Sequence, residues 1–195
     1  MRLVTLAILI AAGPVSAQGI ATYFWDVNGT GSNAASIGPG EIVELTLYAD
    51  WAPHEGIVGI AGTIYDIVGV ENWTTGTLTN WSRNLYPFLD EWLPDENNEF
   101  HWLEAFQLPP AFNPDFDASR PIWLYRMTWV PDDYTPRTVS VTDANHLNND
   151  FYTDEFRTSV GYDQAPSLGA TIHIVPAPWT TPLVALCVAA RRRRA

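Results

Sequence analysis

Residues 41–50, EIVELTLYAD, contain the pattern that decides the fold. Apolar residues at positions 43, 45, 47 and 49 alternate there with Glu44, Thr46 and Tyr48. A repeat of two residues is the period of a β-strand that buries one face and exposes the other to solvent. Residues 122–130, IWLYRMTWV, have the same period. Both stretches are therefore predicted to be β-strands.

Other runs of β-branched and aromatic residues predict six more strands, at 21–27, 57–68, 77–81, 100–106, 137–142 and 171–174. Turn clusters rich in Gly, Pro, Asn and Asp lie between the strands, as at 38–40 and 130–133. The polar stretches 113–117 and 143–150 are predicted to be solvated loops. Seven to nine short strands in one domain predict an all-β fold, an antiparallel β-sandwich over residues 18–174.

The composition limits the class of protein. The 195 residues are 47% hydrophobic and 13% aromatic, which is enough apolar material for one full-sized core. The formal net charge is −12 and the chain has no Lys, so binding of nucleic acid through a basic face is excluded. A single Cys excludes a disulfide framework and a zinc site built on several thiolates.

The N-terminus has the layout of a signal peptide. Arg2 precedes an apolar run over residues 3–12, and Val15-Ser16-Ala17 forms a small-x-small cleavage site. Residues 1–17 are therefore predicted to be removed by cleavage between Ala17 and Gln18. Without the two ends, five Arg remain against all 22 acidic residues, which gives the body a formal charge of −17.

Residues 175–195 combine three features in a fixed order. These are the motif Val175, Pro176, Ala177 and Pro178, an apolar run to residue 190, and the closing cluster Arg191, Arg192, Arg193 and Arg194. An apolar run before an Arg cluster obeys the positive-inside rule, but residues 179–190 are too few for a spanning helix of roughly 20 residues. The tail is therefore predicted to contact the inner membrane transiently.

This order of features resembles the PEP-CTERM sorting signal of Gram-negative bacteria, in which a Pro-Glu-Pro-like motif, an apolar stretch and an Arg cluster end a secreted protein. Ala177 stands where that family usually has Glu. The resemblance implies cleavage near the motif by an exosortase, a membrane-embedded cysteine protease. It also implies export through the inner membrane, followed by release or attachment at the cell surface.

Three sequence features of the body follow one another in a characteristic order. A Gly-Pro-Gly turn at 38–40 opens a strand, and a Gly-hydrophobic-Gly pattern within 56–66 ends in Tyr65-Asp66. A late apolar strand at 122–130 then precedes a Thr-Val-Ser-Val strand within 137–142. In this order the body resembles the cohesin and carbohydrate-binding-module group of β-sandwiches, which implies the same fold.

The densest acidic stretch is 90–99, with five carboxylates in ten residues. Asp95, Asn97 and Glu99 alternate there, as oxygen ligands of Ca²⁺ often do. The stretch lacks the Gly and the bidentate Glu of an EF-hand. A weak Ca²⁺ site and a solvated loop are both left open, and no other cofactor is predicted.

No motif in the sequence indicates catalysis. There is no Gly-x-Ser-x-Gly elbow and no phosphate-binding loop, and the four His are scattered and predicted to be structural or exposed. Glu91 and Glu104, near Trp92 and Trp102, are the pair to test as acid and base in glycoside hydrolysis. A secreted carbohydrate-active enzyme is therefore the alternative function.

Eight of the nine Trp lie in the body. Trp73 and Trp81 stand in polar segments and are the candidates for stacking on an extracellular polysaccharide, with core packing as the other interpretation. Taken together, the sequence predicts an exported, surface-sorted, non-catalytic β-sandwich. Its role is structural, adhesive or ligand-binding, at the cell surface or in the extracellular matrix.

Overall fold

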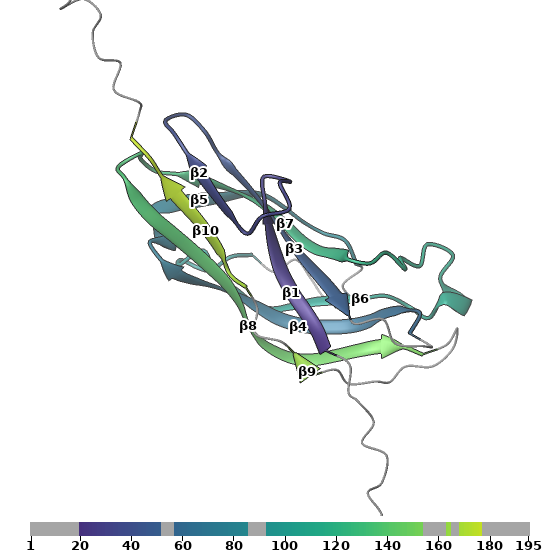
Figure 1. Ribbon diagram of the computed structural model, residues 1–195. Coiled ribbons are helices and arrows are strands. Elements are labelled where there is room, and N and C mark those ends of the chain that lie inside the picture. Colours follow the sequence, from purple (N-terminus) through teal and green to yellow (C-terminus); the bar gives the residue numbers. More distant parts are fainter. Residues whose placement is uncertain (1–19, 52–56, 86–92, 154–162, 165–167, 177–195) are drawn as a thin grey trace, which may run out of the picture.

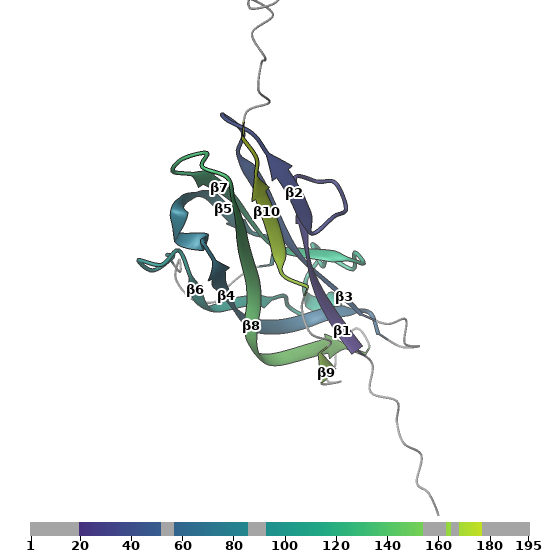
Figure 2. The same ribbon diagram turned by 60° about the vertical axis from the view of Figure 1, so that its left-hand side comes forward.

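The computed structural model describes residues 20–51, 57–85, 93–153, 163–164 and 168–176. Ten strands in these residues form two sheets of five strands, which pack face to face (Figures 1 and 2). The predicted all-β sandwich is confirmed. Among the described residues, no helix is long and apolar enough to cross a membrane.

The first sheet, sheet A, has the strand order β5-β7-β3-β1-β9. Its strands are β5 (Gly76–Arg83), β7 (Ile122–Pro131), β3 (Val43–Trp51), β1 (Ile20–Val27) and β9 (Asp163–Gln164). Neighbouring strands are antiparallel, except that the short β9 pairs with β1 in parallel.

The second sheet, sheet B, has the order β2-β10-β8-β4-β6. Its strands are β2 (Ala34–Ile37), β10 (Ala170–Ile174), β8 (Arg137–Tyr152), β4 (Gly59–Glu71) and β6 (Phe100–Phe106). The pairs are antiparallel except for β2 and β10. Two short 3₁₀ helices, η1 (Trp73–Thr75) and η2 (Pro110–Phe112), lie in connections. In Figure 1, β1 starts at the lower end of the sandwich and β10 ends at the upper end.

The core lies between the sheets and is built by alternating strand residues. In β3, the apolar residues of the opening stretch are all buried, while Glu44, Thr46 and Tyr48 face outward. Trp25 and Trp129 are among the largest fully buried side chains. Burial of these apolar faces supplies most of the favourable free energy of folding, because each fully buried large side chain contributes about 1.5–3 kcal/mol.

One predicted element is wrong in its extent. The predicted strand at 137–142 continues through the supposed loop at 143–150, and β8 ends at Tyr152. Asp, Asn and His are poor strand formers, so the local pattern gives no sign of this extension. The strand is set instead by its neighbour, since β8 pairs with β4 from Glu71↔Ser140 to Gly59↔Tyr152.

Candidate functional site

The acidic loop before β6 is closed by its own hydrogen bonds. The backbone N–H of Asp95 donates to the Glu99 carbonyl at 2.9 Å. The Asp95 carboxylate accepts from the backbone N–H groups of Asn97 at 2.7 Å and of Glu99 at 2.9 Å. Asn98 has a left-handed backbone, and its side-chain amide donates to the Gly76 carbonyl at 2.7 Å. These bonds hold the loop against sheet A.

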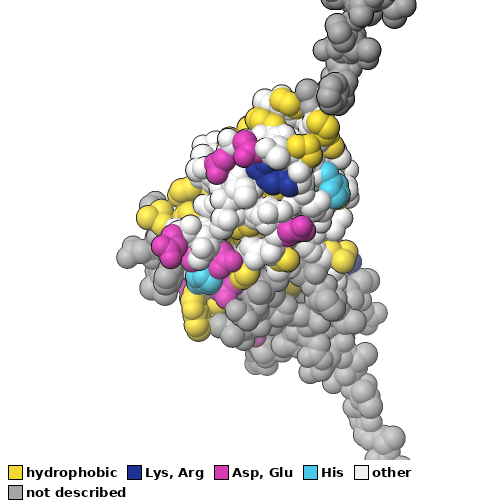
Figure 3. Space-filling view, turned by 90° about the vertical axis from the view of Figure 1, so that its left-hand side faces the viewer, with side chains coloured by type: hydrophobic (Ala, Val, Ile, Leu, Met, Phe, Trp, Pro, Cys, Tyr) yellow, Lys and Arg dark blue, Asp and Glu magenta, His cyan; other side chains and the backbone are white. Residues whose placement is uncertain are grey.

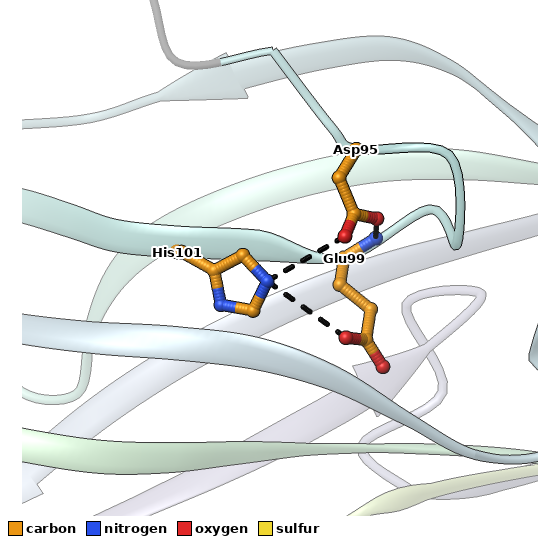
Figure 4. Close-up of side chains that lie close together, drawn as sticks. All are labelled: Asp95, Glu99 and His101. Atoms are coloured by element: carbon orange, nitrogen blue, oxygen red, sulfur yellow. Dashed lines mark hydrogen bonds and ion pairs between the residues drawn. The ribbon is translucent and has the colours of Figure 1, made fainter.

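The loop brings two carboxylates against His101, the second residue of β6 (Figure 4). The Nε2 atom of His101 lies 3.6 Å from Asp95 Oδ2 and 3.8 Å from Glu99 Oε2. On the other side of the ring, Nδ1 lies 3.8 Å from Oδ2 of the buried Asp66. We call Asp95, Glu99 and His101 the carboxylate–histidine cluster. In the space-filling view, acidic side chains gather around one histidine, with hydrophobic side chains beside them (Figure 3).

The hydrogen bonds of the loop favour the ionised form of Asp95. The backbone N–H of Glu99 is the largest cause that lowers the pKa of Asp95 below its usual value. Burial is the next-largest cause and opposes this shift, while the backbone N–H of Asn97 and the nearby His101 lower the pKa further. Glu99 is held in place by its Oε1 atom, which accepts from the Gly69 backbone N–H at 3.0 Å.

These residues could hold a divalent cation, and the cluster joins His101 to the predicted Asp95 and Glu99. One atom from each member of the cluster lies within 4.8 Å of the others, and these atoms are two carboxylate oxygens and an imidazole nitrogen. The backbone N–H of Asn97 donates to Asp95, and a ligand role for its side-chain oxygen stays a prediction. A nitrogen ligand suits Zn²⁺ and similar ions better than Ca²⁺, which prefers oxygen.

Sequence reasoning missed His101, because its partners approach from a loop and from β4. Its position two residues after Glu99 was the one available signal, and that spacing alone does not distinguish a ligand from a solvated residue.

Trp102, which the sequence marks only as an aromatic neighbour of Glu104, has an unusual environment. It lies at a β-bulge where β6 shifts register against β4, between Tyr65↔Leu103 and Ile67↔Phe100. Its backbone has a left-handed φ of 58°, which is rare for a bulky side chain. Its N–H donates to Asp66 Oδ1 at 2.7 Å, and its side chain is 55% exposed. Strained residues of this kind often occur at functional sites.

The two Trp proposed for glycan stacking have different environments. Trp73 is 2% exposed, stacks on Trp129 and donates from Nε1 to the Asn98 carbonyl at 2.9 Å. The stacking hypothesis therefore does not hold for Trp73, because its ring is part of the core. Trp81 is 37% exposed and contacts the buried Phe100 edge to face.

The predicted roles of several other residues stay predictions. Glu104 lies half-buried on β6, while Glu91 lies outside the described residues, so their separation is not defined. Val175 follows β10, and its N–H donates to the Ile37 carbonyl at 2.9 Å. Pro176 is the last described residue. The described part also leaves out the predicted cleavage site, Ala17 and Gln18, and the rest of the sorting signal, Ala177, Pro178 and Arg191–Arg194.

Comparisons with known proteins identify the fold. No protein-family model and no curated protein matches this chain. A type I cohesin of Pseudobacteroides cellulosolvens superposes with a TM-score of 0.58 at 11% identity, over 82% of this chain and 96% of the cohesin. A cohesin from a cohesin–dockerin complex of Clostridium thermocellum gives 0.54 at 10% identity, over 81% and 95%. A cohesin of Acetivibrio cellulolyticus, in complex with a dockerin, gives 0.54 at 7% identity, over 80% and 99%. The chain therefore has the fold of cohesin modules.

Proposed function

We propose that this protein is an exported, surface-sorted, non-catalytic module that binds a partner protein at the cell surface or in the extracellular matrix. The observation that carries the proposal is the match to nearly the full length of cohesin modules, two of which are seen with a dockerin. At 7–11% sequence identity, these matches support a shared fold and do not identify a partner. The partner of this chain therefore has to be found by experiment.

Export and sorting are assigned to the two ends. The signal peptide at 1–17 directs the chain across the inner membrane of a Gram-negative bacterium. The motif Val175-Pro176-Ala177-Pro178 and Arg191–Arg194 then present the tail to an exosortase. Since Val175 directly follows β10, the tail leaves the sandwich next to the last core strand.

The partner surface is assigned to β6, which with β2 is one of the two edge strands of sheet B and which carries the exposed Trp102. An outermost strand offers unpaired backbone groups to a second chain. Trp102 adds a half-exposed indole, and Trp is enriched among the residues that dominate binding energy at protein interfaces. The strain at its backbone supports a role outside folding, because an Asn or Gly would adopt the same φ at lower cost.

Sorting is tested by intact mass and cell fractionation in a host that has an exosortase. The wild-type protein should start at Gln18, lack the residues after the Pro178 motif and reach the surface. A variant with Arg191–Arg194 replaced by Ala should keep its tail and stay in the membrane fraction. If both proteins behave alike, the sorting assignment is wrong.

Partner binding is tested by crosslinking on intact cells, followed by titration with the purified partner that mass spectrometry identifies. Trp102→Asn should weaken the complex at least about fivefold, because an exposed aromatic anchor is lost. The same variant should be as stable as wild type or up to about 1 kcal/mol more stable, because Asn tolerates the left-handed backbone. Trp81→Asn is the matched control, and equal loss of binding in both variants would refute the assignment to Trp102.

A further inference from the structure

The outer face of sheet A carries a row of three aromatic side chains at one level of the sheet. Phe24 on β1 pairs with Tyr48 on β3, and Tyr48 pairs with Trp123 on β7. All three are half-buried, while their neighbours along the strands, such as Leu47, point into the core. The rings of Phe24 and Tyr48 stack with centroids 5.5 Å apart. The row crosses three strands and is therefore about 10 Å long.

Cationic and polar groups border this row. The guanidinium of Arg126 lies over the Trp123 ring, with Cζ 4.3 Å from the ring centroid. Two residues beyond Tyr48, Asp50 accepts from Arg120 Nε at 2.8 Å. The row is thus flanked by planar groups that can both donate and accept hydrogen bonds.

A hollow of about 450 Å³ adjoins the row between β1, β3, β5 and β7. Tyr48 of the row and the neighbouring Arg126 both line the hollow, which adds the polar side chains of Asp26, Glu44, Asn80 and Ser82. Aromatic surface next to a few convergent polar groups is the usual composition of a small-molecule site.

We infer that this face binds a neutral polysaccharide, with Tyr48 and Trp123 packing against sugar C–H groups and Arg126 bonding to hydroxyls. A sugar ring presents C–H groups on its faces and hydroxyls around its rim, so aromatic and polar planar groups side by side match both surfaces. The ligand is neutral because the body has a formal charge of −17 and the hollow itself contains two carboxylates beside one guanidinium. An anionic polysaccharide would be repelled. The inference does not rest on the partner protein proposed above.

The test is native affinity electrophoresis of the full-length mature protein in gels that contain one polysaccharide each. Mixed-linkage β-glucan and galactomannan serve as neutral probes, and alginate serves as the anionic probe. At least one neutral probe should retard the wild-type protein, whereas alginate should not. Retardation by alginate alone would overturn the ligand class, and no retardation by any probe would overturn the inference.

Variants locate the site. Trp123→Ala and Arg126→Gln should each weaken retardation at least about fivefold. Arg126 is exposed, so its replacement leaves the core untouched and keeps the test valid if Trp123→Ala unfolds. Trp102→Asn is the control, because it removes a more exposed Trp on sheet B, and it should bind the polysaccharide like wild type. If Trp102→Asn loses binding while Arg126→Gln keeps it, the site on sheet A is refuted. Because partner binding should show the opposite pattern, the two proposals can fail separately.

Discussion

At the scale of single residues, two of the five described non-Gly residues with a positive φ lie beside the candidate site. Asn98 and Trp102 both adopt left-handed φ values, of 60° and 58°. Asn tolerates this conformation because its short polar side chain bonds locally, and here it bonds to the Gly76 carbonyl. Trp102 has no such compensation in its side chain, and the Asp66 carboxylate stabilises the bulge by accepting its N–H. Asp66 therefore contacts both the bulge, through Oδ1, and His101, through Oδ2.

Asp95 should make the stability of the protein depend on pH at the acid end. Its pKa is lowered in the folded state, so its contribution is complete above the unfolded value of about 4 and is lost as the pH falls through the folded value. We expect Asp95→Asn to lower the urea midpoint slightly at pH 7. The difference from wild type should shrink below about pH 4.

The measurement is the urea midpoint between pH 7 and pH 2.5, with Glu96→Gln in the same loop as the control. Glu96→Gln should follow the wild-type curve more closely than Asp95→Asn does. An Asp95→Asn difference that stays constant down to pH 2.5 would show that the carboxylate charge plays no part.

At the scale of elements, glycines set how closely the layers approach one another. Gly76 begins β5, where a Cβ would lie 2.4 Å from Cε2 of the fully buried Trp129. Trp129 cannot move aside easily, because its Nε1 donates to the Trp73 carbonyl at 3.1 Å and Trp73 stacks on it. The connection through η1 and the start of β5 is thus packed around two indoles, with Gly76 as the one residue small enough to fit.

Gly76→Ala should therefore destabilise the protein by about 1–3 kcal/mol, as overpacking of a filled core does. Gly38→Ala is the matched control, since its Cβ would meet Glu41 Oε2 at an ordinary 3.8 Å. The control should change the free energy of unfolding by no more than about 0.5 kcal/mol. Urea denaturation of both variants decides the point, and equal values would refute the packing argument.

At the scale of the whole molecule, charge is the dominant feature. The body has 22 acidic residues against five Arg. Two of these Arg form ion pairs, Arg120 with Asp50 and Arg137 with Asp133. Such an excess keeps an exported protein soluble, but it also makes the compact state repel itself. Stability should therefore respond to ionic strength.

We expect the melting temperature to rise by about 2–4 °C between low salt and about 0.3 M NaCl, because salt screens the repulsion. A fall with NaCl would contradict this explanation. CaCl₂ at equal ionic strength separates screening from binding. A larger rise with CaCl₂ that Asp95→Asn removes would place Ca²⁺ at the carboxylate–histidine cluster, and an equal rise would assign the effect to screening.

The sequence by itself determined the class of fold. Its side chains follow a period of two along 41–50 and 122–130, and only a β-strand places every second residue on one buried face. It also located the acidic loop with Asp95 and Glu99, since local density of carboxylates is visible in one dimension. The tertiary structure alone decided the length of β8, the burial of Trp73 and the approach of His101 to the carboxylates. It also decided the alignment of Phe24, Tyr48 and Trp123. Each of these depends on pairing between strands far apart in the chain, and strand register is a property of two segments that neither segment encodes alone.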